Sequence, residues 1–284
     1  MEELLKKLTE IEESTKCNKD KQDSAYIRLQ CVQILQQISE KLLTEYYIQV
    51  GSLRIDPLRV EAYYFHEGTF EDCATYKRNE QKKFNRLYLH GTDVGREGVD
   101  ICIGSGSEEK NGDRYLSFLI KDAIVTDEDD KSVYCKQTVL YYKLKKVNEI
   151  KKTQKKVLQV KPKVKTDVFY TVRNGLSDKP FGQEPLGTLI PVKEIQIKKE
   201  YIVEEDENKE YLIDTKDIIL KGISFYDFEK GFGKQWMLAK YALEKSHLNI
   251  EKAREIIKQE GLYQYKIEDQ YIENALNYIK NHEK

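Results

Sequence analysis

The spacing of apolar residues changes twice along the chain, and this restricts what the chain can fold into. Near the N-terminus, Leu4 and Leu8 begin a series at the three- to four-residue spacing of an amphipathic helix. From Gly51 the apolar runs become short, rich in β-branched and aromatic residues, and bounded by glycine or charged turns, as strands are. From Gly231 the helical spacing returns, and Asn249 is placed to cap one of these helices. A β-region between helical ends is therefore expected.

These patterns predict an α+β fold, in which a curved, mostly antiparallel β-sheet or open barrel is flanked by N-terminal and C-terminal helices. We divide the chain into an N-terminal helical segment (1–50), a β-rich core (51–230) and a C-terminal helical segment (231–284). The apolar face of the second N-terminal helix is predicted to extend to Tyr46. The run "TVLYYKLKKV" (138–147) is predicted to continue the strands.

Composition and charge narrow the classes of partner. Hydrophobic residues make up 39% of the 284 residues and charged residues 34%, which is compatible with a globular core. The formal net charge is −1, so a nucleic acid or an anionic lipid would have to be held by a local patch. The segment 143–165 offers such a patch, because it holds ten lysines against the single acid Glu149.

Cysteine and histidine usage argues against disulfides and metals. The five cysteines are scattered and form no Cys-x-x-Cys pair, and the four histidines show no ligand spacing, so we expect no metal and no cofactor. The N-terminus is acidic and amphipathic, unlike a signal peptide, and no apolar run approaches the roughly 20 residues that span a bilayer. We therefore expect a cytoplasmic protein that does not enter membranes.

The stretch "VEAYYFHEG" (60–68) places a carboxylate between apolar residues and beside aromatic rings. Strand alternation puts Glu61, Tyr63 and Phe65 on one face. A carboxylate there could deprotonate water and face a developing positive charge, while the rings could stack on an extruded base. A solvated glutamate on an edge strand is the commoner use of such a residue, so composition alone leaves both interpretations open.

Several segments together resemble the central portion of the alkyladenine (3-methyladenine) DNA glycosylase family. Glu61-Ala62-Tyr63 is identical to the family's Glu-Ala-Tyr, and Tyr88 to Gly91 resembles its aromatic strand ending in Tyr-Gly. Leu119 to Lys121 is similar to its Leu-Ile-Arg, and Gly231 to Leu243 is similar to its Gly-Pro-Gly-Lys-Leu segment. The resemblance covers roughly residues 51–125 and 231–243.

The resemblance implies a monofunctional enzyme of base excision repair, which flips a damaged purine out of double-stranded DNA and hydrolyses its N-glycosidic bond. Glu61 would activate the water. The base pocket and the intercalating wedge would come from Tyr63, His66, Tyr88, His90, Asp100 and Lys121. The helix entry and the basic stretch would hold phosphates through Gly231, Gly233, Lys234, Lys151, Lys152, Lys155 and Lys156.

Three departures from the family pattern keep other functions open. His90 stands where the family has tyrosine, Asp100 where it has asparagine, and Lys121 where it has arginine. Loss of the tyrosine and of the arginine favours a non-catalytic module that binds nucleic acid or a protein through the basic stretch and the terminal helices. Asp100 would place a negative charge near the base and so alter which purines fit. The retained Glu61 and Tyr63 favour an enzyme. A hydrolase of free nucleosides is the third alternative, for which a near-neutral charge is no handicap.

Overall fold

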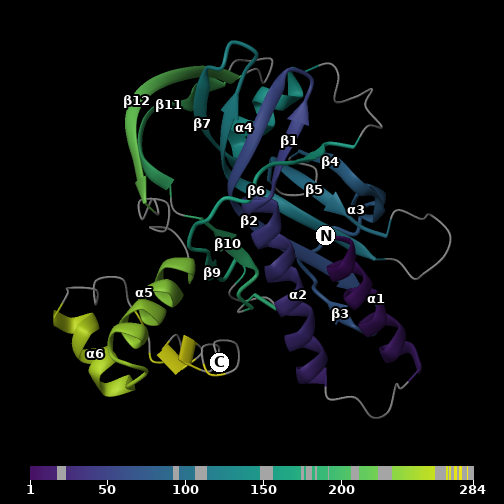
Figure 1. Cartoon of the computed structure of the whole chain (residues 1–284), viewed down its shortest axis with the longest axis vertical. Coiled ribbons are helices and arrows are strands. Elements are labelled where there is room, and N and C mark those ends of the chain that lie inside the picture. Colours follow the sequence, from purple (N-terminus) through teal and green to yellow (C-terminus); the bar gives the residue numbers. More distant parts are fainter. Residues whose placement is uncertain are drawn as a thin grey trace. The chain divides into compact units, whose positions relative to one another are not determined.

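The structure is a computed structural model, and it describes most of the chain (Figure 1). The described residues are 1–17, 24–91, 96–105, 114–147, 156–173, 176, 181–182, 184–190, 192–205, 211–222, 232–259, 267, 269, 272–273, 275–276 and 280. They form six helices and a sheet of twelve strands that does not close on itself. The predicted α+β class, with an open and mostly antiparallel sheet and helices at both ends of the chain, is confirmed.

Two compact units share the chain. The larger unit comprises Met1–Phe169 and Leu186–Ile223, and the smaller one comprises Tyr170–Pro185 and Ser224–Lys284. The N-terminal helices belong to the same unit as every strand of the sheet except β9, which is divided between the two units. The helices are α1 (Glu2–Cys17), α2 (Ser24–Thr44), α3 (Asn79–Lys82), α4 (Gln137–Lys145), α5 (Phe232–Lys245) and α6 (Ile250–Gln259). The strands are β1 (Tyr46–Val50), β2 (Leu53–His66), β3 (Phe70–Glu71), β4 (Phe84–His90), β5 (Gly98–Ile103), β6 (Tyr115–Thr126), β7 (Ser132–Lys136), β8 (Leu158–Val160), β9 (Phe169–Thr171), β10 (Gly187–Leu189), β11 (Val192–Glu205) and β12 (Tyr211–Gly222).

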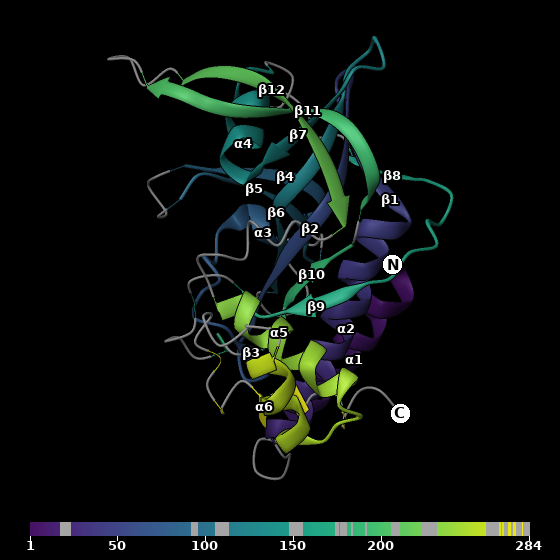
Figure 2. The same cartoon turned by 90° about the vertical axis from the view of Figure 1, so that its left-hand side faces the viewer.

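Strand β2 is the central strand of the sheet in the larger unit, because it pairs with β1, β3, β6 and β10. It pairs with β6 along most of its length, and the main path of the sheet runs β12-β11-β7-β6-β2-β1-β8. Strand β5 pairs with residues 117–119 of β6, while β7 pairs with residues 122–126 of the same strand. Strand β4 pairs in turn with β5. These pairings are antiparallel except that of β11 with β7, which is parallel. Strands β11 and β12 form a long, curved hairpin (Figure 2).

The two faces of β2 have different neighbours. Val60, Ala62 and Tyr64 lie on one face, where each is at most 1% exposed, and α2 packs on the strand. The Tyr64 hydroxyl donates to Glu12 of α1 at 2.7 Å, so α1 lies on this side too. We call this side the helix face. Glu61 and its alternate neighbours point the other way, as predicted, and we call that side the Glu61 face.

A buried ion pair holds α1 to the sheet. The carboxylate of Glu12 accepts hydrogen bonds from both the Nε and the Nη2 atoms of Arg114, which directly precedes β6. Arg114 also donates to the hydroxyl of Thr9, one helical turn earlier, at 2.6 Å. Since Glu12 is 3% exposed and Arg114 is 5% exposed, this pair is removed from water on both sides.

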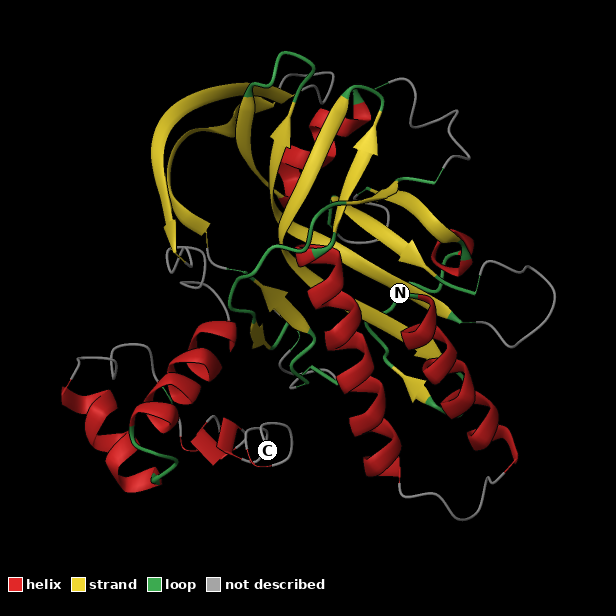
Figure 3. Cartoon of the chain, viewed as in Figure 1, coloured by secondary structure: helices red, strands yellow, loops and turns green. Residues whose placement is uncertain are grey.

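Two predicted elements differ in the structure. Residues 138–147 were expected to be a strand, but they form most of helix α4 (Figure 3). Five consecutive or near-consecutive side chains of α4 are buried, because the helix packs on β5, β6, β7 and β11 together; they are Val139, Leu140, Tyr141, Tyr142 and Leu144. Four successive buried side chains hide the 3.6-residue period, so this sequence resembles a buried strand. The second correction is Tyr46, which begins β1 because α2 ends at Thr44.

The smaller unit packs α5 against α6. Ala239, Ala242 and Leu243 of α5 form a buried cluster with Ala253 and Ile257 of α6. The small alanine side chains allow the two helices to approach closely. In the described part of the chain, no helix has both the length and the apolar character needed to cross a membrane.

The start of α6 has the cap that its sequence predicts. The Asn249 side-chain oxygen accepts from the Lys252 backbone N–H at 3.0 Å, which satisfies one of the unpaired donors at the start of the helix.

We predict that Glu12→Gln destabilises the larger unit strongly. The substitution leaves the buried Arg114 guanidinium without its counter-charge, which costs about 3–5 kcal/mol of unfolding free energy. Urea unfolding followed by circular dichroism measures this. Glu3→Gln is the matched control, because Glu3 lies on the same helix in an exposed pair with Lys7, and it should leave the midpoint unchanged. Equal midpoints for both variants would contradict the structural role of the buried pair.

Candidate functional site

The carboxylate of Glu61 lies in the middle of β2 and is 1% exposed. Its Oε1 atom is 3.5 Å from Arg59 Nη2, and its Oε2 atom is 3.6 Å from Lys121 Nζ. The Tyr63 hydroxyl donates to Oε2 at 3.1 Å. Arg59 and Tyr63 flank Glu61 at two-residue spacing, so all three side chains leave β2 on the same side. Two cations and one hydroxyl thus surround a carboxylate that water scarcely reaches.

A β-bulge brings Lys121 to this carboxylate. In the β2–β6 register, Val60 pairs with Ile120 and Arg59 pairs with Asp122, so Lys121 is an extra residue without a partner across the strands. Such a bulge interrupts the alternation of side chains and sends two successive residues to one side. Lys121 and Asp122 therefore both lie on the Glu61 face, where Asp122 Oδ2 is 3.8 Å from Arg59 Nη1.

Tyr134 of β7 extends this polar network. Its hydroxyl donates to Asp122 Oδ1 at 2.7 Å. Burial, followed by the neighbouring charge of Asp122, raises the pKa of Tyr134 far above its usual range, so the phenol remains a donor at any physiological pH. The network therefore runs without a break from Glu61 through Arg59 and Asp122 to Tyr134.

A second buried carboxylate lies in the same row of the sheet. Asp100 of β5 pairs with Leu119, which in turn pairs with Glu61, so the three side chains share one face. Asp100 is 2% exposed, and its Oδ2 atom accepts from Ser117 at 2.8 Å. Ser117 accepts in turn from the Gln81 amide at 2.9 Å. No donor among the described residues makes a hydrogen bond to the other oxygen, Oδ1, which is therefore a buried acceptor without a hydrogen bond.

His90 is held against Asp100 by close packing. Its Nδ1 atom is 2.7 Å from the Arg96 carbonyl oxygen, and since a carbonyl only accepts, Nδ1 carries a proton. The Nε2 atom then faces Asp100 Oδ1 at 3.5 Å. Gly98 makes this approach possible, because a Cβ atom there would lie 2.5 Å from the His90 ring and 2.7 Å from Leu119.

Aromatic rings surround the His90–Asp100 pair. The ring centroids of Tyr76 and Tyr88 are 5.3 Å and 5.6 Å from that of His90. Tyr88 is half-buried, as is Tyr63 beside Glu61, while Tyr76 is 39% exposed. The two buried acids are therefore accompanied by rings that solvent still reaches.

The structure brings most of the predicted pocket residues onto one face, and it separates one from them. Tyr63 and Lys121 contact Glu61, while Tyr88, His90 and Asp100 lie further along the same face. His66 lies on the helix face instead, because it is five residues from Glu61 in a regular part of the strand, and its Nδ1 atom is 2.9 Å from the Thr69 hydroxyl.

The predicted phosphate contacts are only partly described. Gly231, Lys151, Lys152 and Lys155 lie outside the described residues, as does the side chain of Lys234. Gly233 lies within α5, whose first residue is Phe232, and Lys156 is exposed.

The basic stretch is partly neutralised by acids elsewhere in the larger unit. Lys143 pairs with Glu200 at 2.7 Å and Lys161 with Asp56 at 2.7 Å. Lys163 pairs with Glu45 at 3.4 Å. These partners are distant in sequence, so counting charges along the stretch overestimates its positive potential.

Two members of the site were missed at the sequence level. Arg59 precedes Glu61 by two residues, so strand alternation could have placed it on the same face. Asp122 would have been assigned to the opposite face by alternation, because the bulge at Lys121 has no signature in the sequence.

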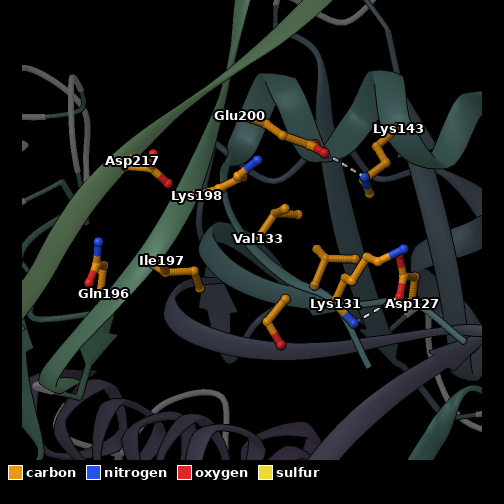
Figure 4. Close-up of a pocket in the computed structure, with 11 residues that line it drawn as sticks. Asp127, Lys131, Val133, Lys143, Gln196, Ile197, Lys198, Glu200 and Asp217 are labelled. Carbon is orange, nitrogen blue, oxygen red and sulfur yellow. Dashed lines mark hydrogen bonds and ion pairs between the residues drawn. The ribbon is translucent and has the colours of Figure 1, made fainter. Parts of the chain in front are cut away.

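A cavity of about 550 Å³ opens on the helix face, away from Glu61 (Figure 4). It lies between the β6–β7 turn, the β11–β12 hairpin and α4. Its charged lining residues are Asp127, Lys131, Lys143, Lys198, Glu200 and Asp217. Acids and lysines are equal in number, and Lys143 and Glu200 already form an ion pair across it. This cavity therefore has no excess of one charge with which to select an anion or a cation.

We predict energetic coupling between Glu61 and Lys121. Lys121→Met and Glu61→Gln should each destabilise the fold, and the double variant should lose less than the sum, with a coupling energy of about 0.5–3 kcal/mol. Urea unfolding of the four proteins measures this cycle. The exposed pair Lys131–Asp129, at 2.9 Å, is the control and should show no measurable coupling. Additive losses at Glu61 and Lys121 would contradict a direct charge interaction.

Comparison with known proteins assigns no family to this chain. No family model matches it, and no curated protein sequence matches it either. In the described part of the chain, no group of three or more His, Cys, Asp or Glu side chains is arranged to hold a metal ion. The chemistry of the Glu61 face therefore has to be inferred from the side chains present there.

Proposed function

We propose that this protein is a monofunctional purine DNA glycosylase, which hydrolyses the N-glycosidic bond of an alkylated or deaminated purine flipped out of double-stranded DNA. The observation that carries the proposal is the state of Glu61, a carboxylate removed from water but held between Arg59 and Lys121. The resemblance of Glu61-Ala62-Tyr63 to the alkyladenine DNA glycosylase family points to the same reaction.

The surroundings of Glu61 suit a general base. Both cations stand farther from its oxygens than a strong hydrogen bond requires, at 3.5 Å and 3.6 Å, so they compensate its charge without a tight contact. The Tyr63 hydroxyl fixes the orientation of the carboxylate. A water between Glu61 and the sugar would pass a proton to the carboxylate as its oxygen bonds to the anomeric carbon, and the purine would leave with the electrons of the broken bond.

The same carboxylate would stabilise the transition state electrostatically. Positive charge develops on the sugar as the glycosidic bond breaks, and a preorganised negative group in a water-poor site interacts with it strongly. Lys121 and Arg59 limit this attraction, because they already offset part of the negative charge. The Lys121 ammonium lies where the family has an arginine, so it keeps the charge and loses the planar, two-pronged geometry.

The neighbouring rings suit an extruded base. Tyr63 and Tyr88 are half-buried, so each could present one side of its ring to a flat ligand. Asp100 Oδ1 accepts no hydrogen bond from a described residue and faces His90 Nε2 at 3.5 Å, so a donor on the edge of the base would approach these two groups together. A damaged purine with a donor at that edge would thus be preferred over one with an acceptor.

We predict that Glu61→Gln greatly slows base release. Duplex oligonucleotides that contain alkylated or deaminated purines are incubated with the protein, and free base is measured by chromatography under single-turnover conditions. Removal of a general base should lower the rate by about 10²–10⁴-fold. Asp127→Asn is the matched control, because this acid lines the cavity on the helix face, and its rate should equal that of the wild type.

Three results would contradict the proposal. Equal rates for wild type and Glu61→Gln would exclude Glu61 as the base, and binding of the duplex without release by the wild type would favour a non-catalytic module. Release from free nucleosides but not from duplex DNA would assign the site to a small-molecule hydrolase. Lys121→Arg is a separate test of the base pocket that the family resemblance implies. It restores the arginine of the family, so the rate of base release should stay the same or rise.

A further inference from the structure

Four residues that line the cavity beside α4 form one row across four neighbouring strands. Val125 of β6 pairs with Val133 of β7, and Val133 pairs with Lys198 of β11. Lys198 pairs in turn with Asp217 of β12. All four residues line the cavity of about 550 Å³, on the side where directly opposed residues leave their strands together. This row, which we call the cavity row, therefore presents two apolar side chains, then a cation, then an anion.

The charged end of the cavity row is not closed by an ion pair. Lys198 and Asp217 lie directly opposite each other and carry opposite charges. Neither side chain makes an ion pair or a hydrogen bond with another residue in the part of the chain that the structure describes. Both side chains are exposed, and Figure 4 shows them beside Val133 at the cavity. A ligand that enters the cavity can therefore reach both charges.

The other charged residues of the cavity already have partners. Glu200 accepts a hydrogen bond from Lys143 of α4 at 2.7 Å, and this pair forms one wall. The Oδ1 atom of Asp127 accepts from the backbone N–H groups of Asp129 and Lys131, at 3.0 Å and 2.9 Å, and so closes the β6–β7 turn. The Lys131 ammonium is bound by Asp129 at 2.9 Å. These contacts stabilise the walls, and they leave the two charges of the cavity row for a ligand.

The spacing of Lys198 and Asp217 restricts the kind of ligand. Opposed Cβ atoms of an antiparallel pair are about 4.5–5.5 Å apart, so the two side chains can contact two charged groups carried by one carbon atom. A carboxylate suits the Lys198 ammonium, which has three donors and no acceptor. A primary ammonium suits the Asp217 carboxylate, which only accepts. A ligand with a single charge would satisfy only one of the two residues, whereas a zwitterion satisfies both.

The apolar end of the row gives the ligand a direction. Val133 borders Lys198 and is half-buried, so part of its surface is open to the cavity, and Val125 closes the floor behind it. A ligand side chain that extends from the charged carbon toward β6 would cover Val133 and remove apolar surface from water. Cavities of about 300–1,000 Å³ are typical of small-molecule sites, and this one, at about 550 Å³, has room for such a side chain.

We propose that the cavity beside α4 binds an α-amino acid with an apolar side chain. The carboxylate of the amino acid contacts Lys198, its ammonium group contacts Asp217, and its side chain lies over Val133. The proposal depends on the cavity row alone. It is independent of the glycosylase proposal, because Glu61 lies on the other face of the sheet.

Isothermal titration calorimetry of the full chain with L-phenylalanine tests the site. One molecule should bind per chain, and Lys198→Met and Asp217→Asn should each raise Kd about tenfold, because each removes one charge-assisted contact. Lys199→Met and Asp214→Asn are the matched controls. They remove the same charges from the opposite face of the same two strands, where Asp214 is bound by Tyr201, and they should leave Kd unchanged.

Two analogues with a single charge show which side chain contacts which group. L-phenylalaninamide lacks the carboxylate, and 3-phenylpropionate lacks the ammonium group, so both should bind more weakly than L-phenylalanine. Lys198→Met should weaken binding of 3-phenylpropionate and leave that of L-phenylalaninamide unchanged, and Asp217→Asn should show the reverse pattern. Binding of 3-phenylpropionate as tight as that of L-phenylalanine would overturn the proposal, because the contact with Asp217 would not be required.

Two further results would overturn the proposal. The first is the absence of saturable binding of both L-phenylalanine and L-leucine to the wild type. The second is an equal rise of Kd in Lys198→Met and Lys199→Met, since net charge alone would then explain the loss. Thermal unfolding confirms that the variants are folded, and both cavity variants should keep the Tm of the wild type, because the two exposed side chains make no contact within the fold.

Discussion

A carboxylate that is almost completely shielded from water must be compensated by nearby charge, and at Glu61 this requirement organises one whole face of the sheet. Arg59 meets it from the same strand, and Lys121 meets it from the neighbouring strand. Arg59 then shares its charge with Asp122, which is oriented by Tyr134. Without these partners, a buried charge of this kind would cost several kcal/mol. The irregular pairing of β2 with β6 therefore has an electrostatic reason as well as a geometric one.

The sheet and the two orientations along β2 could be predicted from the sequence, because period-two alternation is read directly from neighbouring residues. That alternation predicts that Glu61 and Tyr63 lie on the same face of β2. Helix α4 could not be predicted in the same way, since four successive buried side chains, Val139 to Tyr142, hide its helical period. The pairing of Glu61 with Lys121 depends on one extra residue in β6, and nothing local marks that residue as the bulge.

The electrostatics show why charge counting along a sequence is insufficient. The segment 143–165 has the strongest run of lysines, yet three of its described lysines are bound to Glu200, Asp56 and Glu45. By contrast, Lys136, Lys199 and Lys216 lie on three separate strands and form no run in the sequence. These three lysines come together only through the register of β7, β11 and β12. Local concentration of charge is thus a property of strand pairing, which no window of the sequence displays.

The parallel pairing of β11 with β7 has a consequence for the order of folding. The residues between Lys136 and Val192 form a long connection that must close before β7 and β11 can pair. Strands β6 and β7, in contrast, are joined by a short turn. Closing such a long loop carries an entropy cost that adjacent hairpins avoid, and pairings of this kind form slowly. We expect the β11–β12 hairpin to form early by itself and to dock on β7 late. A partial fold would then already contain the β2–β6 ladder while its outermost strands were still undocked, so the buried carboxylate would gain its counter-charges before the sheet was complete.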